Sequence, residues 1–248
     1  MNAQSGLERC LSFINCQLRS NGKDRNVTKP GRHITVVTIS RQTGCGARGI
    51  AHKLAEYLQA RSAKSEPQWT VFDRDLVNKV LEEHNLPQSL AKFMPENRIS
   101  EISDTIDDLF GLHPPSELLV RQTAETILHL AKLGNVILIG RAANIITAKF
   151  DCALHIRLVG SVARRVQRIE KSDHLDEKAA LELIRSEDLG RRRYLSKYYG
   201  KDINDPLFYH LVINTDLMDC TDAARLISDF VLEKRSRARS ENPHGTMN

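Results

Sequence analysis

Residues 36–58 read VVTISRQTGCGARGIAHKLAEYL, a sequence that predicts a β-strand, a glycine-bearing turn and then an α-helix. The three glycines, Gly44, Gly46 and Gly49, lie between the apolar run and the helical pattern. Turns of this kind present backbone N–H groups to phosphate at the N-terminus of the following helix. The stretch therefore favours an α/β fold with an anion site. Whether the loop binds a nucleotide, a dinucleotide or nothing depends on the rest of the chain.

Short apolar segments and helical patterns alternate along the chain after residue 34. The strand candidates are 34–39, 69–72, 136–139, 153–158 and 211–214. The helical patterns are 49–61, 75–110, 116–133, 161–170, 176–198 and 221–235. Strands that are apolar throughout are typical of a sheet covered on both faces. The alternation predicts a parallel sheet wrapped by helices.

The two ends of the chain differ from this pattern. Residues 7–18 have apolar side chains at helical spacing, and the polar, turn-rich stretch 20–32 follows as a linker. We expect residues 1–33 to form an amphipathic helix and linker, which packs on the body, on a partner or on a second copy. The tail 236–248 is polar without periodicity and is expected to be disordered.

Composition restricts the class of protein. Hydrophobic residues make up 41% of the 248 residues and charged ones 27%, as in ordinary soluble globular proteins. No apolar run approaches the roughly 18 residues of a membrane span, and the N-terminus lacks a signal-peptide pattern. The five cysteines show no CxxC spacing, so neither a zinc site nor a disulfide framework is indicated. A cytoplasmic location is expected.

The net charge of +5 is unevenly distributed, because arginines concentrate in residues 157–193. Few aromatic residues lie among them, and no nucleic-acid-binding motif is present. A smaller polyanion, such as a nucleotide phosphate, fits this basicity at least as well as nucleic acid, and charge alone does not decide between them. We expect a small nucleotide as the partner, and neither nucleic acid nor a membrane.

Two motifs overlap in the glycine loop. GCGARG, 44–49, matches the dinucleotide pattern G-x-G-x-x-G, and Asp73 lies near the distance of its ribose-binding acid. With the strand expected to end at residue 39, however, four residues precede Gly44. That length suits a Walker loop, G-x-x-x-x-G-K-[ST], laid over residues 41–48. In this register Arg41 replaces the first glycine, Gly46 is kept and Ala47 stands at the lysine position.

Without the lysine, Arg48 is the nearest cation of the loop. A guanidinium can bind two phosphate oxygens at once. The simpler alternative is a glycine turn that only joins strand and helix. We expect a phosphate-binding loop made of Thr43, Gly44, Cys45, Gly46, Ala47, Arg48 and Gly49.

Further candidates follow later strands. Arg141 lies just past the end of the strand 136–139, at the sheet edge where α/β proteins bind ligands. Arg164 and Arg168 repel each other at i,i+4 on a helix unless an anion lies between them. Asp188 lies three residues before Arg191, so its carboxylate can orient that guanidinium. Ordinary surface charges would have the same spacings, but the number of arginines favours a lid over phosphates.

Six segments together resemble the cytidylate kinase-like family, relatives of the nucleoside monophosphate kinases. They are ITVVTISRQTGCGARGIAHKLAEYL, VFDRDLV, VILIGRAANII, HIRLVGSVARRVQRI, DLGRRRYLSKYYGKD and YHLVINTDLMDCTDAARLI, and they span about residues 34 to 231. This family often has a phosphate loop without the Walker lysine. The resemblance implies a P-loop kinase-like three-layer domain over 34–235, with a five-stranded parallel sheet in the order 2-3-1-4-5. A helical insert at about 75–115 and a lid at about 164–200 are also implied.

The resemblance further implies transfer of the ATP γ-phosphoryl, with Mg²⁺, to a small phosphorylated acceptor such as a nucleoside monophosphate. Catalytic roles would fall to Arg48, Asp188 and Arg191, and lid contacts to Arg164 and Arg168. The acceptor would be bound by Asp73, Arg74, Lys79 and Arg141, while no residue is assigned to the metal. Cytidylate kinases carry GRD after the third strand, and here Ala142 replaces the acid. Two alternatives stay open: a non-catalytic nucleotide sensor and a dinucleotide-dependent oxidoreductase.

Overall fold

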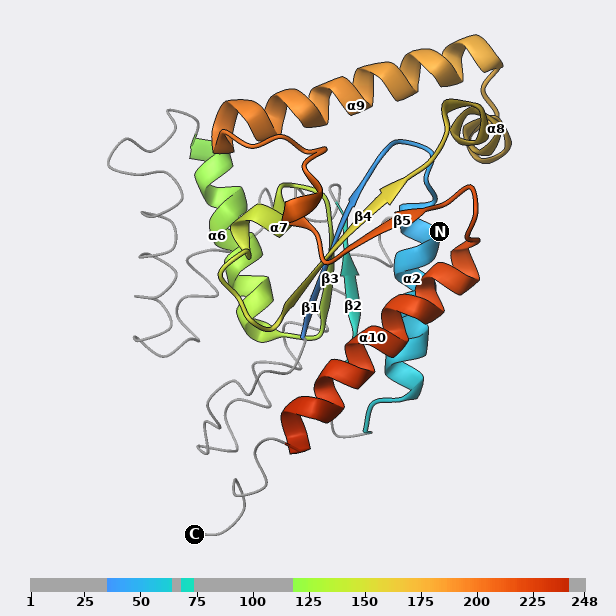
Figure 1. Cartoon of the computed structure of the whole chain (residues 1–248). Coiled ribbons are helices and arrows are strands. Elements are labelled where there is room, and N and C mark those ends of the chain that lie inside the picture. Colours follow the sequence, from blue (N-terminus) through green and yellow to red (C-terminus); the bar gives the residue numbers. More distant parts are fainter. Residues whose placement is uncertain (1–34, 64–67, 74–117, 241–248) are drawn as a thin grey trace, which may run out of the picture.

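The computed structural model describes residues 35–63, 68–73 and 118–240, which form one parallel sheet and the helices around it (Figure 1). The strands are β1 (Val36–Arg41), β2 (Thr70–Phe72), β3 (Val136–Ile139), β4 (Ala153–Val159) and β5 (Leu211–Asn214). Their order across the sheet is β2-β3-β1-β4-β5, and every pairing is parallel. The predicted α/β fold and its strand order are confirmed.

This order rules out the dinucleotide fold. In that fold the second strand lies next to the first, in the order 3-2-1-4-5-6. Here β1 lies between β3 and β4, and β2 is at the sheet edge. The prediction of four residues between strand and first glycine was also wrong. β1 continues through Ser40 and Arg41, which pair with Arg157 and Leu158 of β4, so two residues precede Gly44.

Alternate residues of the strands form the two faces of the sheet. Val37 and Ile39 face the layer of α2 (Ala47–Ala60) and α10 (Cys220–Ser240). Val36 and Leu138 face the layer of α6 (Leu118–Leu133) and the four-residue helix α7 (Ala143–Ile146). Figure 1 shows these two layers on opposite sides of the sheet. Burial on both faces explains why the strands are apolar almost throughout.

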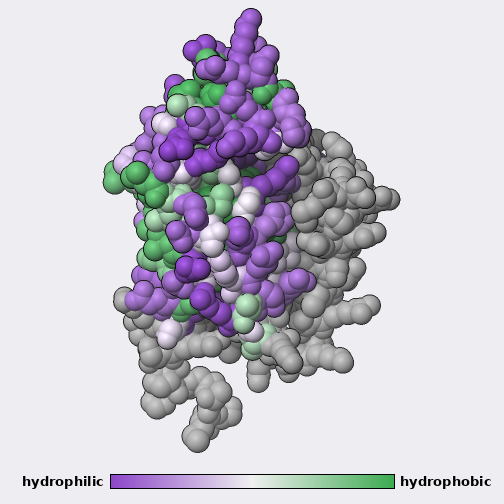
Figure 2. All heavy atoms as spheres, turned by 90° about the vertical axis from the view of Figure 1, so that its right-hand side faces the viewer, coloured by the Kyte–Doolittle hydropathy of each residue, from purple (hydrophilic) through white to green (hydrophobic). Residues whose placement is uncertain are grey.

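Helices α8 (Val162–Asp173) and α9 (Glu177–Tyr199) lie beyond the carboxyl ends of the strands (Figure 1). Val166 and Ile169 of α8 pack on Ala180 and Ile184 of α9 in a small core of their own. Ser161 and Asp176 cap the two helices through side-chain hydrogen bonds. Residues 164–200, for which a lid is predicted, comprise most of α8 and all of α9. Hydrophilic residues cover much of the molecular face seen in Figure 2.

Several boundaries differ from the prediction. Helix α7 and the 3₁₀ turn at Pro206–Phe208 were not predicted, because elements of three or four residues show no periodicity. Helix α10 continues to Ser240, so residues 236–240 are helical and do not belong to a disordered tail. The N-terminal segment 1–33, the whole insert 75–115 and the last eight residues lie outside the described residues. None of the described helices is long and apolar enough to span a membrane.

Candidate functional site

The loop between β1 and α2 requires two of its three glycines. Gly44 and Gly46 have φ of 84° and 74°, in the left-handed region that favours glycine. A Cβ on Gly44 would lie 2.7 Å from the carbonyl oxygen of Arg165, so α8 packs directly on this residue. A Cβ on Gly49 would meet only Cys220 Sγ, at an ordinary 3.9 Å. The loop conformation therefore depends on Gly44 and Gly46, whereas the third glycine of the motif is not required.

A cavity of about 380 Å³, the loop cavity, opens over this turn. Thr43 through Arg48 form one wall, and Leu183, Glu187 and Arg191 of α9 form another. Helix α2 begins here without an acidic first turn or a side-chain cap, which leaves its N-terminus suited to an anion. Six of the seven residues predicted to bind phosphate line the cavity, and Gly49 does not.

Cys45 lies in the middle of the loop and is almost fully buried. Burial raises the pKa of its thiol, so the side chain stays protonated at neutral pH. It adds no negative charge next to a bound phosphate.

Asp188 connects the α8–α9 pair to the loop. Its Oδ1 accepts hydrogen bonds from the Thr43 N–H at 2.8 Å and the Thr43 hydroxyl at 3.0 Å. The same oxygen accepts from Arg191 Nη2 at 2.7 Å, as the three-residue spacing predicted, and Oδ2 accepts from Arg165 Nη1 at 2.7 Å. Arg191 Nη2 also contacts Thr43 Oγ1. One carboxylate thus holds two arginines and the loop together.

Two opposing effects act on the pKa of the Asp188 carboxyl. Burial alone would raise it, but hydrogen bonds from Thr43, Arg191 and Arg165 outweigh burial and hold this pKa below its usual range. Asp188 is therefore ionised at neutral pH and keeps both guanidinium groups in place.

Arg165 was missed in the sequence prediction, which singled out its neighbours Arg164 and Arg168. Arg165 is buried and donates to Asp188, to the Thr43 carbonyl and to the Gly160 carbonyl. Its spacing from Val162 and Ile169 places it on the apolar face of α8, a signal that the sequence did contain. Arg164 is exposed, whereas Arg168 donates to Thr215 and to the Gly44 carbonyl.

Arg48 and Asp73 form an ion pair at the loop cavity. Nε and Nη2 of Arg48 each lie 2.8 Å from Asp73 Oδ2. The sequence prediction gave these residues to different ligands, Arg48 to the triphosphate and Asp73 to the acceptor, and the structure brings them together. The side chain of Arg48 is 66% exposed. Arg74 and Lys79, the other acceptor candidates from this region, lie outside the described residues.

The turn after β3 holds Arg141 in an unusual conformation. Gly140, Arg141 and Ala142 have φ of 80°, 53° and 57°, so three left-handed residues follow one another. For the two non-glycine residues this costs about 1–2 kcal/mol each. Such strain is concentrated at functional sites in proteins. The turn places Arg141 in the wall of a second cavity.

This second cavity, the α7 cavity, has a volume of about 260 Å³. Its wall includes Ser40 of β1, Asn144 of α7 and Tyr194 of α9, together with Arg141. Arg41, Glu187 and Arg191 belong to the walls of both cavities. Arg191 is fixed between two carboxylates, because Nη1 lies 2.8 Å from Glu187 Oε2 while Nη2 binds Asp188. The two cavities therefore adjoin at a wall that carries two guanidinium groups.

Arg41 is the second functional candidate that the sequence prediction did not choose. A Cβ on Gly140 would lie 2.0 Å from Arg41 Nη1, so the guanidinium passes directly over that glycine. The Walker alignment treated Arg41 only as a replacement for a glycine. Its place between the cavities depends on the neighbouring strand β3, which local sequence does not reveal.

The wall of the loop cavity offers few direct ligands for Mg²⁺. The carboxylates in the loop-cavity wall are Asp73 and Glu187, and each is paired with an arginine. Over the part of the chain that the structure describes, no group of three or more His, Cys, Asp or Glu residues could hold a metal. These residues fit an Mg²⁺ ion that arrives on phosphate oxygens and keeps several waters.

Comparisons with known proteins find relatives of this chain. A family model described as "Cytidylate kinase-like family" matches residues 36–217. The chain is 29% identical to a cytidylate kinase of Pyrobaculum neutrophilum over 200 residues, which cover 80% of this chain and 93% of the relative. It is 30% identical to a cytidylate kinase of Methanothrix thermoacetophila over 184 residues, 74% and 90% of the two chains.

The fold is also found in a solved structure. It is an uncharacterized protein from Eubacterium ventriosum, with a TM-score of 0.51 and 18% identity, covering 82% of this chain and 99% of that one. At this identity the likeness concerns the fold alone.

Proposed function

The chain belongs to the cytidylate kinase-like family, and we propose that it is a phosphotransferase that moves the γ-phosphoryl group of ATP to a small phosphorylated acceptor. Nucleoside monophosphates are the first candidates for the acceptor, since the similar proteins are named cytidylate kinases. The observation that carries the proposal is the shared wall of the loop cavity and the α7 cavity. A phosphate chain in one and an acceptor in the other would meet at Arg41 and Arg191, and such positioning lowers the barrier of a two-substrate reaction.

The loop would hold the donor. Backbone N–H groups around Gly44 and Gly46 and the N-terminus of α2 suit the phosphates of ATP. Arg48, at the same cavity, would neutralise the outer phosphates. Magnesium, bound with ATP, would neutralise further phosphate charge.

The shared wall would act on the group in transfer. Phosphoryl transfer depends mainly on positioning and on charge stabilisation. Arg191 is suited to this because Glu187 and Asp188 fix both ends of its guanidinium group before any substrate arrives. Arg41 offers a second guanidinium at the same wall, and Arg141 would hold the acceptor in the α7 cavity.

A second candidate function is nucleotide binding without turnover. Ala47 stands where a Walker lysine would reach the transferred phosphate, and Arg48 is engaged with Asp73. A protein of this kind would bind ATP without transferring phosphate, and the α8–α9 pair would signal that ATP is bound.

A coupled ADP-release assay distinguishes the two candidates. The purified full chain is assayed with Mg²⁺ and ATP against CMP, dCMP, UMP, AMP and GMP, and any ligand that copurifies is identified by mass spectrometry. The phosphotransferase proposal expects ADP release above the ATP-only rate with at least one acceptor. ATP binding by calorimetry without ADP release for all five would reject the nucleoside monophosphate kinase and favour the binding protein.

A further inference from the structure

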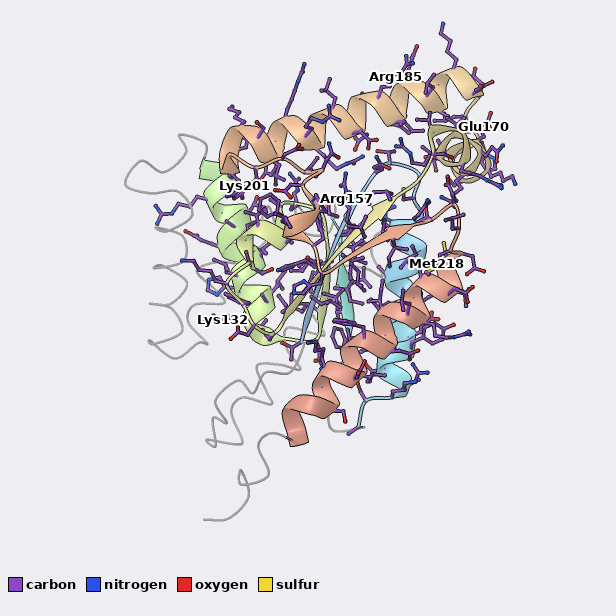
Figure 3. The ribbon with its side chains drawn as sticks, viewed as in Figure 1. Lys132, Arg157, Glu170, Arg185, Lys201 and Met218 are labelled. Atoms are coloured by element: carbon purple, nitrogen blue, oxygen red, sulfur yellow. The ribbon has the colours of Figure 1, made fainter. Side chains whose placement is uncertain are left out.

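Arg157 is a buried cation directly behind the α7 cavity. It lies on β4 opposite Ser40 of β1, and its side chain is on the sheet face that α6 and α7 cover. Only 5% of its surface is exposed. Figure 3 shows Arg157 near the centre of the molecule, between the sheet and α9.

The hydrogen-bond partners of Arg157 are neutral. Nη1 donates to Ser40 Oγ at 2.8 Å, and Nη2 donates to Asn204 Oδ1 at 3.3 Å. The guanidinium carbon also lies 6.0 Å from the centre of the Tyr209 ring. Within the described residues, therefore, the structure gives this guanidinium no ion pair.

Asp188 favours the charged form of Arg157 at longer range, but its carboxylate is already bonded to Arg165 and Arg191. Arg165 is equally buried and has the ion pair that Arg157 lacks. Arginine stays protonated even where burial opposes it. A buried charge is costly unless an opposite charge compensates it, so the position calls for an anion that the described residues do not supply.

The cavity is the place where such an anion can lie. Ser40 is part of the α7-cavity wall, so a single hydroxyl separates the Arg157 guanidinium from that space. Tyr209 Oη lies 3.3 Å from Ser40 Oγ and donates to the Ile203 carbonyl at 2.8 Å, which fixes the hydroxyl from the other side. The acidic residue of this wall, Glu187, is paired with Arg191.

We propose that Arg157 is a positioning residue that gives the α7 cavity a fixed positive floor through Ser40, and that this floor selects a phosphate monoester over its uncharged counterpart. The inference rests on the proposed function only in taking the α7 cavity as the acceptor site. It adds that the acceptor must be negatively charged. It attributes this requirement to Arg157, which does not touch the acceptor.

A purely structural role is the competing explanation. Through Asn204 and Tyr209, Arg157 also holds residues 203–209 against β4. In that case its loss would lower thermal stability and leave anion affinity unchanged below the melting temperature.

The test uses the full chain with its loop cavity filled by a non-hydrolysable ATP analogue. Calorimetric titrations with CMP, cytidine and inorganic phosphate compare wild type with Arg157→Met and Arg157→Lys. Arg235→Met is the matched control, because Arg235 also donates to a neutral amide, Asn135 Oδ1 at 2.7 Å, and stacks on Trp69 near the other end of the strands. If Arg157→Met does not fold, Arg157→Gln carries the same comparison.

We expect Arg157→Met to weaken CMP or phosphate binding by about tenfold to a hundredfold, because it removes a positive charge that acts on the anion across the Ser40 hydroxyl. Arg157→Lys should restore most of the affinity, Arg235→Met should bind as wild type, and cytidine should bind all four proteins equally. Unchanged anion affinity in Arg157→Met overturns the inference. So does a wild-type protein that binds neither anion once the loop cavity is filled.

The outcomes also separate this inference from the proposed function. Absent turnover with Arg157-dependent anion binding would reject the kinase and support the positive floor. Turnover with an unchanged acceptor KM in Arg157→Met would support the kinase and reject the positive floor.

Discussion

Asp188 Oδ1 accepts a hydrogen bond from the backbone N–H of Thr43 at 2.8 Å, so a carboxylate of α9 occupies a main-chain donor of the phosphate loop. Loops of this type ordinarily offer such donors to phosphate. Here the Thr43 N–H bonds to the α8–α9 pair instead. Arg191, which is on α9 like Asp188, contacts the Thr43 side chain and Asp188. Arg191, which we place on the transferred phosphoryl group, and the loop that we propose to bind ATP are thus parts of one hydrogen-bonded unit.

Arg191→Ala should lower kcat steeply and change the dissociation constant of ATP little. Its charge is expected to matter more in the transition state than in the ground state, and arginines in such positions contribute on the order of 10³–10⁵ in rate. Steady-state kinetics and calorimetry on the same preparation measure the two quantities.

Arg192→Ala is the matched control, because Arg192 is the exposed neighbour on the same helix. A normal kcat in Arg191→Ala would reject this role of Arg191. Loss of ATP binding with no turnover in wild type would instead favour the nucleotide-binding protein.

Gly44→Ala should lower the free energy of unfolding by about 2 kcal/mol or more, because an alanine at φ of 84° is strained and its Cβ would lie 2.7 Å from the Arg165 carbonyl oxygen. ATP binding should weaken with it, since the loop must shift. Urea unfolding and calorimetry check both effects.

Gly49→Ala gives the opposite expectation. This residue is helical, exposed, and has room for a Cβ, so alanine should stabilise the protein by about 0.5–1 kcal/mol. Equal destabilisation by the two substitutions would contradict the view that Gly44, unlike Gly49, is required by its backbone conformation.

Substitutions of the Arg48–Asp73 pair should act in opposite directions on ATP affinity. Arg48→Ala removes a cation from the loop cavity and leaves the Asp73 carboxylate to repel phosphate, so ATP binding should weaken by about tenfold. Asp73→Asn removes that carboxylate and leaves Arg48 to the nucleotide, so affinity should rise. Calorimetry with ATP and AMP measures both, and the loss in Arg48→Ala should be smaller for AMP. Weaker ATP binding in Asp73→Asn would show that the pair is needed intact.

Stability should fall between about pH 6.5 and pH 4 because of buried histidines. Burial lowers the pKa of His129 and of His155 to about 4, with His210 adding to the effect on His155. The unfolded chain binds these protons near pH 6.5 and the folded chain only near 4, so acid favours unfolding within this window.

From pH 7 to pH 5 each such histidine should reduce the free energy of unfolding by about 2 kcal/mol. His155→Gln should remove the part of that loss that comes from His155, and urea unfolding at the two pH values measures it. An unchanged pH dependence in His155→Gln would mean that this histidine is not held neutral by the fold.

The sheet was predictable because its strands are buried on both faces, which leaves a nearly continuous apolar run such as residues 136–139. The end of β1 was not predictable in the same way. Ser40 and Arg41 are polar, and they are in the strand because they pair with β4, more than a hundred residues later. The composition of the local sequence does not reveal that pairing.

The residues of the candidate site also divide into those that the local sequence reveals and those that it does not. The pairing of Asp188 with Arg191 could be predicted from their spacing on one helix. Arg141 could be chosen because it lies just past the end of β3. Arg41 and Arg157 could not be found this way, because their positions depend on Gly140, which follows β3, and on Ser40 of β1. Arg165 had a usable signal, since helical spacing places it on the apolar face of α8.

The wall shared by the loop cavity and the α7 cavity bears on inhibitor design. A molecule with an anionic group at each end could occupy both cavities at once and touch Arg41 and Arg191 between them. Once one end is bound, the other binds at a high effective concentration, so the affinity of the linked molecule can exceed that of either end by about 10²–10⁴. Because the cavities adjoin, a short linker is the better choice, and each added rotatable link would reduce the gain.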